Sequence, residues 1–242
     1  MKADRTNWDA RYRAGDRPHD GPPSGLLRRW LPAVARRSST DLRRPAAPVA
    51  VPAVRPRALD VATGLGRNAL YLASAGYAVD AVDISHTALR EAARRARQAG
   101  LRGIRWIAAD LDRWRPARGH YDVVVNAFFL NRRLFPALRA AVRPGGLLIF
   151  ETHLAGASDT GPPGRRRIRP GELRRVLRGW DLLYARDGAS RDGARRLALG
   201  RIVARRPLPR APRGRRTRRP PVIRSRRPRR AGRSDWSRVS SP

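Results

Sequence analysis

Short apolar runs alternate with stretches of helical periodicity through the middle of the chain. The apolar runs have the length of buried strands and are bounded by Gly, Asp or Pro, whereas the stretches between them repeat apolar residues every three or four positions. This alternation indicates a mostly parallel sheet with helices on both faces. The pattern predicts strands at 58–61, 78–82, 104–108, 121–125 and 147–151, and helices at 67–75, 87–99 and 136–142.

The pattern changes after residue 170. Pro170-Gly171-Glu172-Leu173 predicts the start of another helix, and residues 181–186 and 196–204 predict two strands separated by a polar turn. Two such strands can pair as an antiparallel hairpin. The expected fold class is therefore α/β, with a doubly wound, mostly parallel seven-stranded sheet, helices on both faces and an antiparallel C-terminal hairpin.

The two ends of the chain differ from this middle part. Residues 7–13 predict a short helix with Trp8 and Tyr12 on one face, and a second apolar helical segment is expected to end at Pro32. Proline-rich and arginine-rich stretches are typical of linkers and disordered segments. The expected organisation is a helical cap at 1–32, a Pro/Ala/Arg-rich linker at 33–56, a folded domain at 57–206 and a disordered Arg/Pro-rich tail at 207–242.

Charge is the outlier in the composition. The chain has 54 Lys and Arg against 19 Asp and Glu, a formal net charge of +35. Arginine binds phosphate through its planar fork, so one interpretation is a nucleic-acid partner, with non-specific contact through the basic tail. The other is that Arg, Ala, Pro and Gly rise together in GC-rich coding sequence, in which an altered reading frame can also produce a tail of this kind. The second interpretation is favoured, because net charge bears on solubility and non-specific binding more than on mechanism.

The lack of cysteines and of long apolar segments excludes or disfavours several classes of protein and site. There are no cysteines, which excludes disulfides and any cysteine-based metal site or nucleophile. The first 16 residues are charged and have no apolar signal region, and no run approaches the ~18 apolar residues that span a bilayer. We expect a cytoplasmic protein with no membrane contact and no metal site; its oligomeric state is left open.

The chemistry-bearing residues lie at predicted strand ends. A strand, then Gly64 and Gly66, then a helix is the arrangement that brings a ligand against bare backbone at a helix N-terminus. The glycine pair alone would also suit a dinucleotide-binding enzyme. Three acids narrow the choice, because Asp60, Asp83 and Asp110 close the first three strands, and ligands bind outside the carboxyl ends of such strands. The acid after the second strand suits ribose hydroxyls, and the acid after the third suits an adenine amino group.

With these motifs the chain resembles class I S-adenosylmethionine-dependent methyltransferases, and within them the tellurite-resistance type. The resemblance covers about Trp8 to Arg206, without the linker. It rests on the stretches at 59–73, 82–85, 109–111, 121–125 and 143–152, on Trp8-Asp9 with Arg11-Tyr12, and on Pro170-Gly171-Glu172-Leu173 with Trp180.

The resemblance implies S-adenosylmethionine as the cofactor. The loop after the first strand would hold its methionine part, although Ala62 and Thr63 replace the residues usual there. Asp83 would hold the ribose and Asp110 would reach the adenine. The cofactor-binding candidates are Asp60, Ala62, Thr63, Gly64, Gly66, Asn68, Asp83, Ile84, Asp110, Leu111 and Asn126, with Trp8 and Tyr12 as a lid.

The acceptor would lie beyond the fourth and fifth strands, and it is expected to be a small molecule such as a chalcogen oxyanion or a thiol. His153 or Glu151 could take a proton from it. Asn131 is a third catalytic candidate, although relatives often carry a His-Arg-Pro-like run where this chain reads Asn131-Arg132-Arg133. Arg132 and Arg133 would favour an anionic acceptor, but a solvated pair is the simpler interpretation.

Three other functions remain open. The same domain could methylate RNA, with the basic tail as an electrostatic anchor and salt-sensitive binding. Against this, Asn126-Ala127-Phe128-Phe129 stands where a base-flipping enzyme would carry an Asn-Pro-Pro-Tyr-type run. The chain could instead be a non-catalytic interaction protein, or an NAD-dependent oxidoreductase, which would have no antiparallel terminal hairpin.

Overall fold

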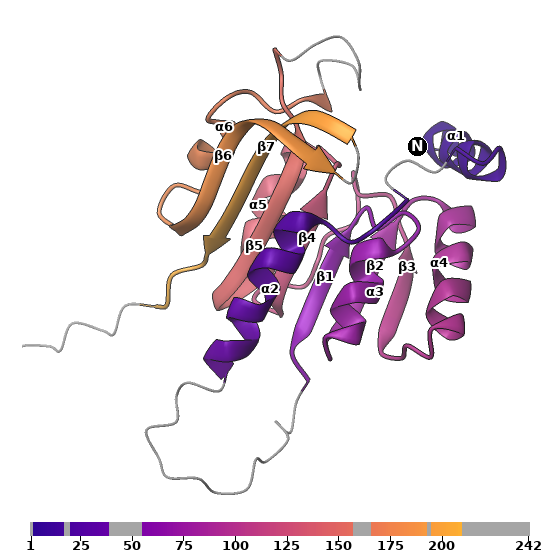
Figure 1. Cartoon of the computed structure of the whole chain (residues 1–242), viewed down its shortest axis with the longest axis horizontal. Helices are drawn as coiled ribbons and strands as arrows, with labels where there is room; N and C mark the ends of the chain where they lie inside the picture. The colour runs from indigo at the N-terminus through magenta and orange to yellow at the C-terminus, as the bar shows by residue number, and fades with distance from the viewer. Residues whose placement is uncertain (1, 17–19, 39–54, 157–165, 193–194, 210–242) are drawn as a thin grey trace, which may run out of the picture. The chain divides into compact units, whose positions relative to one another are not determined.

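A seven-stranded sheet forms the centre of the computed structural model, which describes residues 2–16, 20–38, 55–156, 166–192 and 195–209 (Figure 1). The strand order is β3-β2-β1-β4-β5-β7-β6. The strands are β1 (Arg57–Val61), β2 (Ala78–Asp83), β3 (Ile104–Ala108), β4 (Tyr121–Ala127), β5 (Val142–His153), β6 (Asp181–Asp192) and β7 (Arg195–Arg205).

The pairing of these strands confirms the expected fold class. β1 to β5 pair in parallel, and β7 then pairs antiparallel with both β5 and β6. From β1 the chain continues outward to β2 and β3 on one side of the sheet, and from β4 it continues outward to β5 on the other side. The boundary between β1 and β4 is therefore the point where the strand order reverses. Open sheets of this kind bind ligands at that switch point, outside the carboxyl ends of the strands.

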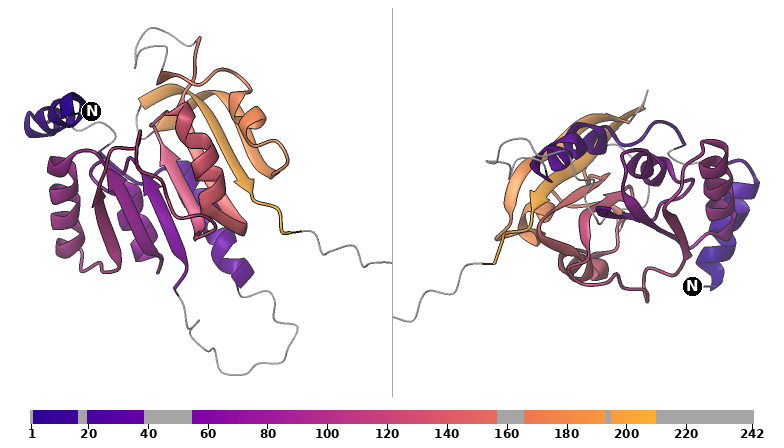
Figure 2. Two further views of the ribbon diagram at one scale, coloured as in Figure 1. Left: turned by 180° about the vertical axis from the view of Figure 1, so that it is seen from behind. Right: turned by 90° about the horizontal axis from the view of Figure 1, so that it is seen from below.

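Helices cover both faces of the sheet (Figures 1 and 2). Buried leucines of α2 and α3 pack on one face with β-branched residues of β2, β4 and β5, while α5 and α6 bury Leu and Phe side chains on the other face. The helices are α1 (Lys2–Arg13), α2 (Gly25–Ser38), α3 (Arg67–Ser74), α4 (His86–Gln98), α5 (Phe135–Ala141) and α6 (Glu172–Val176), with a 3₁₀ turn at Arg132–Leu134.

Local signals in the sequence explain most element boundaries. Ser85 caps α4, because its hydroxyl accepts a hydrogen bond from the Ala88 N–H at 3.1 Å. Gly76 and Gly100 follow α3 and α4 with φ angles of 89° and 64°. This left-handed backbone is the usual end of a helix and favours glycine.

Two boundaries differ from the expectation. α2 does not end at Pro32 but continues to Ser38. A proline inside a helix removes one hydrogen bond and costs about 3 kcal/mol. The buried residues Leu26, Leu27 and Leu31 all precede Pro32, so they fix the first turns of α2, each fully buried side chain contributing roughly 1.5–3 kcal/mol. β5 begins at Val142, before the Pro144-Gly145-Gly146 turn, because Val142 pairs with Tyr121 ahead of a register shift.

The described residues up to Pro209 belong to one compact unit. Most of the expected linker, at 39–54, and the expected tail from residue 210 lie outside the described residues. Within the described ranges, no helix has both the length and the apolar character needed to cross a bilayer.

Candidate functional site

Asp83 holds the loop that follows β1. Asp83 ends β2 and is 7% exposed as a residue, and its carboxylate accepts hydrogen bonds from the N–H groups of Gly64 at 2.8 Å and Ser85 at 2.9 Å. Burial raises the pKa of Asp83, and the backbone N–H donors act in the opposite direction. Each carboxylate oxygen has two lone pairs, so both can accept a further hydrogen bond. The group is therefore a fixed acceptor at the carboxyl edge of the sheet.

Asp60 lies beneath the same loop, at 1% exposure. Its carboxylate accepts a hydrogen bond from the Thr63 hydroxyl at 2.5 Å and one from the Ala69 N–H. Burial raises the pKa of Asp60 to about 7, although Thr63, the Arg67 guanidinium and the Ala69 N–H oppose the shift. The structure thus brings Asp60 and Thr63 together as a support for the loop.

This buried carboxyl should make stability depend on pH. The folded protein holds the Asp60 proton more tightly than the unfolded chain does, because the pKa rises from 3.8 to about 7 on folding. The stabilisation is complete below pH 3.8 and is lost as the pH rises through about 7. Denaturant unfolding of Asp60→Asn between pH 5 and pH 8 should show a smaller fall in the free energy of unfolding than the unsubstituted chain. An equal fall in the free energy of unfolding in both proteins would contradict the raised pKa of Asp60.

The loop from Ala62 to Gly66 has three residues in the left-handed region. Ala62, Gly64 and Gly66 have φ angles of 54°, 55° and 82°. A Cβ on Gly66 would lie 3.0 Å from both the Ala92 Cβ and the Trp106 ring, whereas one on Gly64 would meet the Tyr12 hydroxyl at 2.9 Å. Gly66 therefore allows the loop to pack on α4 and β3, and Gly64 allows an approach from the side of α1.

Ala62 is a strained substitute for glycine. The left-handed backbone costs an L-residue such as alanine roughly 1–2 kcal/mol. Glycine avoids this cost, but its greater freedom in the unfolded chain lowers the free energy of unfolding by about 0.5–1 kcal/mol. We expect Ala62→Gly to raise the free energy of unfolding by up to about 1 kcal/mol, or about 2–4 °C in Tm. Ala75→Gly is the matched control, because Ala75 has a φ of −84°. Thermal unfolding should give shifts of opposite sign, and a Tm loss in both variants would show that Ala62 is unstrained.

The third acid lies at the same edge. Val61 pairs with Val82 and with Asn126, and Asp83 pairs with Ala108, so β1 to β4 all end near the loop. Asp110 follows β3 by two residues and is partly exposed; its carboxylate accepts a hydrogen bond from the Asp112 N–H at 2.9 Å. Of the apolar neighbours, Ile84 is half-buried and Leu111 packs into the core beneath α5.

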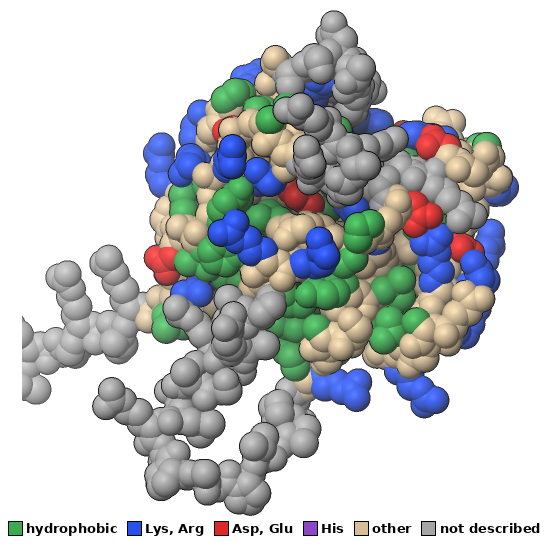
Figure 3. All heavy atoms as spheres, viewed as in Figure 1, with side chains coloured by type: hydrophobic (Ala, Val, Ile, Leu, Met, Phe, Trp, Pro, Cys, Tyr) green, Lys and Arg blue, Asp and Glu red, His purple; other side chains and the backbone are tan. Residues whose placement is uncertain are grey.

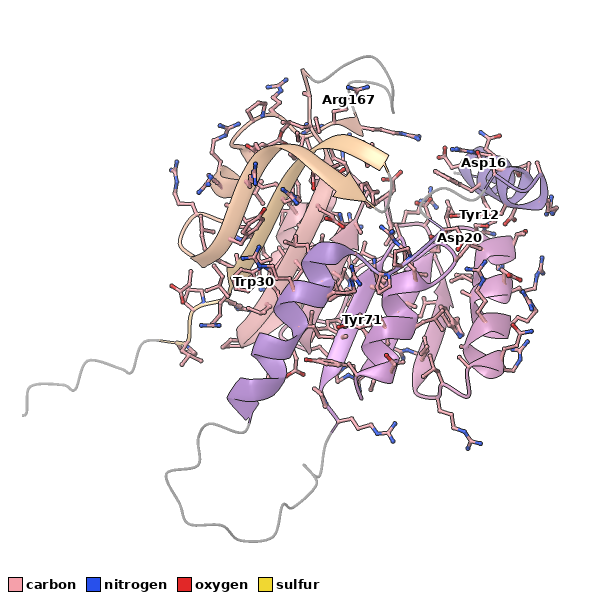
Figure 4. All side chains as sticks on the ribbon, in the orientation of Figure 1. Tyr12, Asp16, Asp20, Trp30, Tyr71 and Arg167 are labelled. Carbon is pink, nitrogen blue, oxygen red and sulfur yellow. The ribbon has the colours of Figure 1, made fainter. Side chains whose placement is uncertain are left out.

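Helix α1 docks over this edge. Asp9 is buried and accepts hydrogen bonds from the Ser85 hydroxyl at 2.6 Å and the Thr87 N–H at 2.9 Å, which ties α1 to the start of α4. Tyr12 lies on the side of α1 that faces the sheet (Figure 4), and its hydroxyl is beside Gly64. Burial and the nearby Asp83 raise the pKa of this phenol. Trp8 is half-buried, with its ring centroid 6.0 Å from that of Tyr12.

A second cluster lies past the ends of β4 and β5. Phe128 has a φ of 62°, which is rare for a bulky residue and costs about 1–3 kcal/mol. Its ring centroid lies 5.5 Å from the Arg67 guanidinium carbon and 5.4 Å from the centroid of the His153 ring. Asn126 donates from its amide nitrogen to the Phe129 carbonyl at 2.7 Å, while its buried Oδ1 accepts no hydrogen bond from any described residue. This region thus contains a buried acceptor, an aromatic face, an imidazole and a guanidinium.

The remaining candidates are engaged elsewhere. The side-chain oxygen of Asn68 accepts a hydrogen bond from the Ser24 N–H at 3.0 Å, and so supports the start of α2. Asn131 binds Asp112 through its amide nitrogen and accepts from the Arg133 N–H, which caps the 3₁₀ turn. Arg132 makes a two-pronged ion pair with Glu172. Glu151 is buried in β5, opposite Ala127 and Arg201.

Two residues of this edge were given no role of their own from the sequence. Asp9 carries the contact that docks α1, and Arg67 stacks on Phe128. The position of Arg67, directly after Gly66 and at the first position of α3, is the one signal that could have indicated it. Asp9 was noted only as part of the Trp8-Asp9 motif, and its docking role could not be predicted because its partners lie 76 and 78 residues away.

Comparison with known proteins places this fold. Residues 58–146 match the family model described as a methyltransferase domain. TehB from Haemophilus influenzae is 18% identical, with a TM-score of 0.55, over 72% of this chain and 62% of that one. Phosphoethanolamine N-methyltransferase 2 from Haemonchus contortus, bound to S-adenosyl-L-methionine, is 14% identical, with a TM-score of 0.57, over 79% of this chain and 55% of that one.

This chain covers almost the whole length of a third solved structure. That structure concerns the conversion of a disulfide bond into a thioacetal group during echinomycin biosynthesis. It is 22% identical, with a TM-score of 0.54, over 84% of this chain and 92% of that one. The chain spans less than two thirds of the TehB and phosphoethanolamine N-methyltransferase chains. No curated protein matches the chain in sequence.

Proposed function

We propose that the chain is a class I S-adenosylmethionine-dependent methyltransferase that transfers the methyl group of this cofactor to a small-molecule acceptor, which the match of residues 58–146 to a methyltransferase domain supports. The observation that carries the proposal is the fixed acceptor at Asp83, which binds the Gly64 loop directly and lies at the edge that also holds Asp60 and Asp110. A glycine loop surrounded by strand-end acids suits a ligand with ribose and adenine groups.

The residues present fit the cofactor. Asp83 retains lone pairs for ribose hydroxyls, and Asp110 is partly exposed beside it for the adenine amino group. Gly64 presents bare backbone beside the Tyr12 hydroxyl, where the methionine part would be held, and Asp60 and Thr63 support the loop from below. The orphaned Asn126 Oδ1 is an acceptor suited to an ammonium or hydroxyl donor. Tyr12 and Trp8 act as the lid.

The bound cofactor supplies a methyl group that its sulfonium already activates. The chain has two tasks. The first is to hold an acceptor in line with the methyl group, for which the Phe128 ring lies just past the end of β4 and the Arg67 guanidinium comes from the first turn of α3. The second is to take a proton from an acceptor such as a thiol. His153 is half-exposed beside Phe128 and suits this role better than the buried Glu151, whereas the Asn131 amide is not basic enough to take a proton.

Two acceptor classes have support. The resemblance to the tellurite-resistance type and the likeness to TehB favour a chalcogen oxyanion, which Arg67 would attract. The likeness to a structure concerned with disulfide and thioacetal chemistry favours a thiol. The alternative is an RNA-directed methyltransferase anchored by its basic tail, which rests on the arginine-rich sequence of residues 207–242.

A methyl-transfer screen with isotope-labelled cofactor tests the proposal. The full chain would be incubated with tellurite and selenite, with small thiols, and with total RNA. We expect label in a volatile or small-molecule product, and none in RNA. Label confined to RNA would replace the proposal with the alternative, and His153→Asn should slow transfer to thiols more than transfer to oxyanions.

A further inference from the structure

A row of arginines faces α1 across a groove of about 340 Å³. Arg90, Arg94 and Arg97 project from α4 at i, i+4 and i+7, and so share one face of that helix. Tyr12 forms the wall on the side of α1, and Leu65 of the glycine loop forms part of the floor. Blue side chains gather along the edge of the molecule where α4 lies (Figure 3).

The groove has a net positive charge. Glu91 is the one acid in its lining, and both of its oxygens are already occupied by Arg94, at 2.7 and 2.9 Å, and by Arg95, at 3.0 Å. These hydrogen bonds hold the pKa of Glu91 well below its ordinary value. Neither Arg90 nor Arg97 forms an ion pair with any carboxylate in the described part of the chain, and both side chains are exposed. Two guanidiniums are therefore available to an anionic partner.

The geometry suits a chain of phosphates. From Arg90 to Arg97 the helix rises by about 10 Å, so the row can contact more than one phosphate of a strand. The planar guanidinium of arginine can donate two parallel hydrogen bonds to two oxygens of one phosphate. Tyr12 adds a half-exposed aromatic ring beside the row, and an aromatic ring beside a basic groove is the combination that binds single-stranded nucleic acid without sequence preference. A lipid surface fits less well, because Leu65 is only 7% exposed and offers no side chain to insert.

We propose that the groove between α1 and α4 binds the sugar-phosphate backbone of single-stranded nucleic acid. The groove belongs to the folded unit, so this binding is separate from any contact made by residues 207–242. It does not depend on the identity of the methyl acceptor. Because Tyr12 lies both in the groove and over Gly64, a bound strand lies beside the lid of the candidate cofactor site.

Fluorescence anisotropy with a labelled 20-nucleotide RNA and the full chain tests the proposal. The double variant Arg90→Gln/Arg97→Gln should bind about tenfold more weakly at 0.1 M salt, and the slope of log K against log salt should fall by about 1.4. The matched control is Arg175→Gln/Arg178→Gln, which removes two exposed arginines at the end of α6 on the other face of the sheet. The control should change affinity less than twofold.

Equal losses of RNA affinity in the two double variants would mean that binding depends only on the total charge of the protein, and would overturn the proposal. Unchanged affinity in the groove variant would overturn it too. A second measurement locates the strand directly: crosslinking with 4-thiouridine RNA should label the peptides that contain Tyr12 or α4. Crosslinks confined to residues 207–242 would contradict the groove, as would an equal loss of binding to phosphatidylserine vesicles in the groove variant.

Discussion

Replacing Asp83 with alanine should weaken S-adenosylmethionine binding by roughly 1–3 kcal/mol, the range for leaving buried ligand hydroxyls without an acceptor. Asp83 is a buried residue, and its carboxylate already accepts hydrogen bonds from the Gly64 and Ser85 N–H groups. Its removal therefore takes away an acceptor for the ribose and also releases the loop. Isothermal titration calorimetry with the cofactor measures the loss directly.

Two further variants separate binding from folding. Asp83→Asn keeps one acceptor oxygen and the size of the side chain, so it should lose less affinity and less thermal stability than Asp83→Ala. Asp181→Ala removes an exposed carboxylate from β6, far along the sheet, and should leave affinity unchanged. An affinity for the cofactor that is unaltered in a folded Asp83→Ala variant would remove Asp83 from the site.

Replacing Gly66 with alanine should have the largest effect on stability of any single methyl addition considered. The left-handed backbone costs an L-residue about 1–2 kcal/mol. The added Cβ would also lie 3.0 Å from the Ala92 Cβ and from the Trp106 ring, and overpacking of this kind typically costs about 1–3 kcal/mol. We expect a total loss of about 2–5 kcal/mol in the free energy of unfolding, measured by denaturant unfolding.

Gly76→Ala separates the two causes. Gly76 has a φ of 89°, but a Cβ there would meet no atom within 4 Å. Its substitution should therefore cost only the backbone strain, about 1–2 kcal/mol. If both variants lost the same stability, the loop would not be packed against α4 and β3 as closely as the structure has it.

The sequence predicted the sheet because its signals are local. Apolar runs such as Val123 to Val125 are buried between neighbouring strands, so their composition alone indicates a central strand. The strand-end acids were predicted for the same reason, since Asp60 and Asp83 close β1 and β2. The parallel order then brings them to one edge without any further information.

What the sequence could not predict depends on contacts between distant residues. Asn68 supports α2 because Ser24 lies beside it, although its place after the glycine loop suggested a ligand contact. Asn131 is engaged by Asp112 and by the turn that it caps. The strained backbone of Phe128 has no signature in composition, because bulky residues adopt a positive φ only where their surroundings impose it.

Calorimetric titration of the full chain with S-adenosylmethionine, and separately with NAD, tests the central claim most directly. One binding site for S-adenosylmethionine that is weakened in Asp83→Ala, together with no detectable binding of NAD, is the predicted result. Binding of NAD at the Asp83 site, or no heat with S-adenosylmethionine from a folded chain, would contradict it.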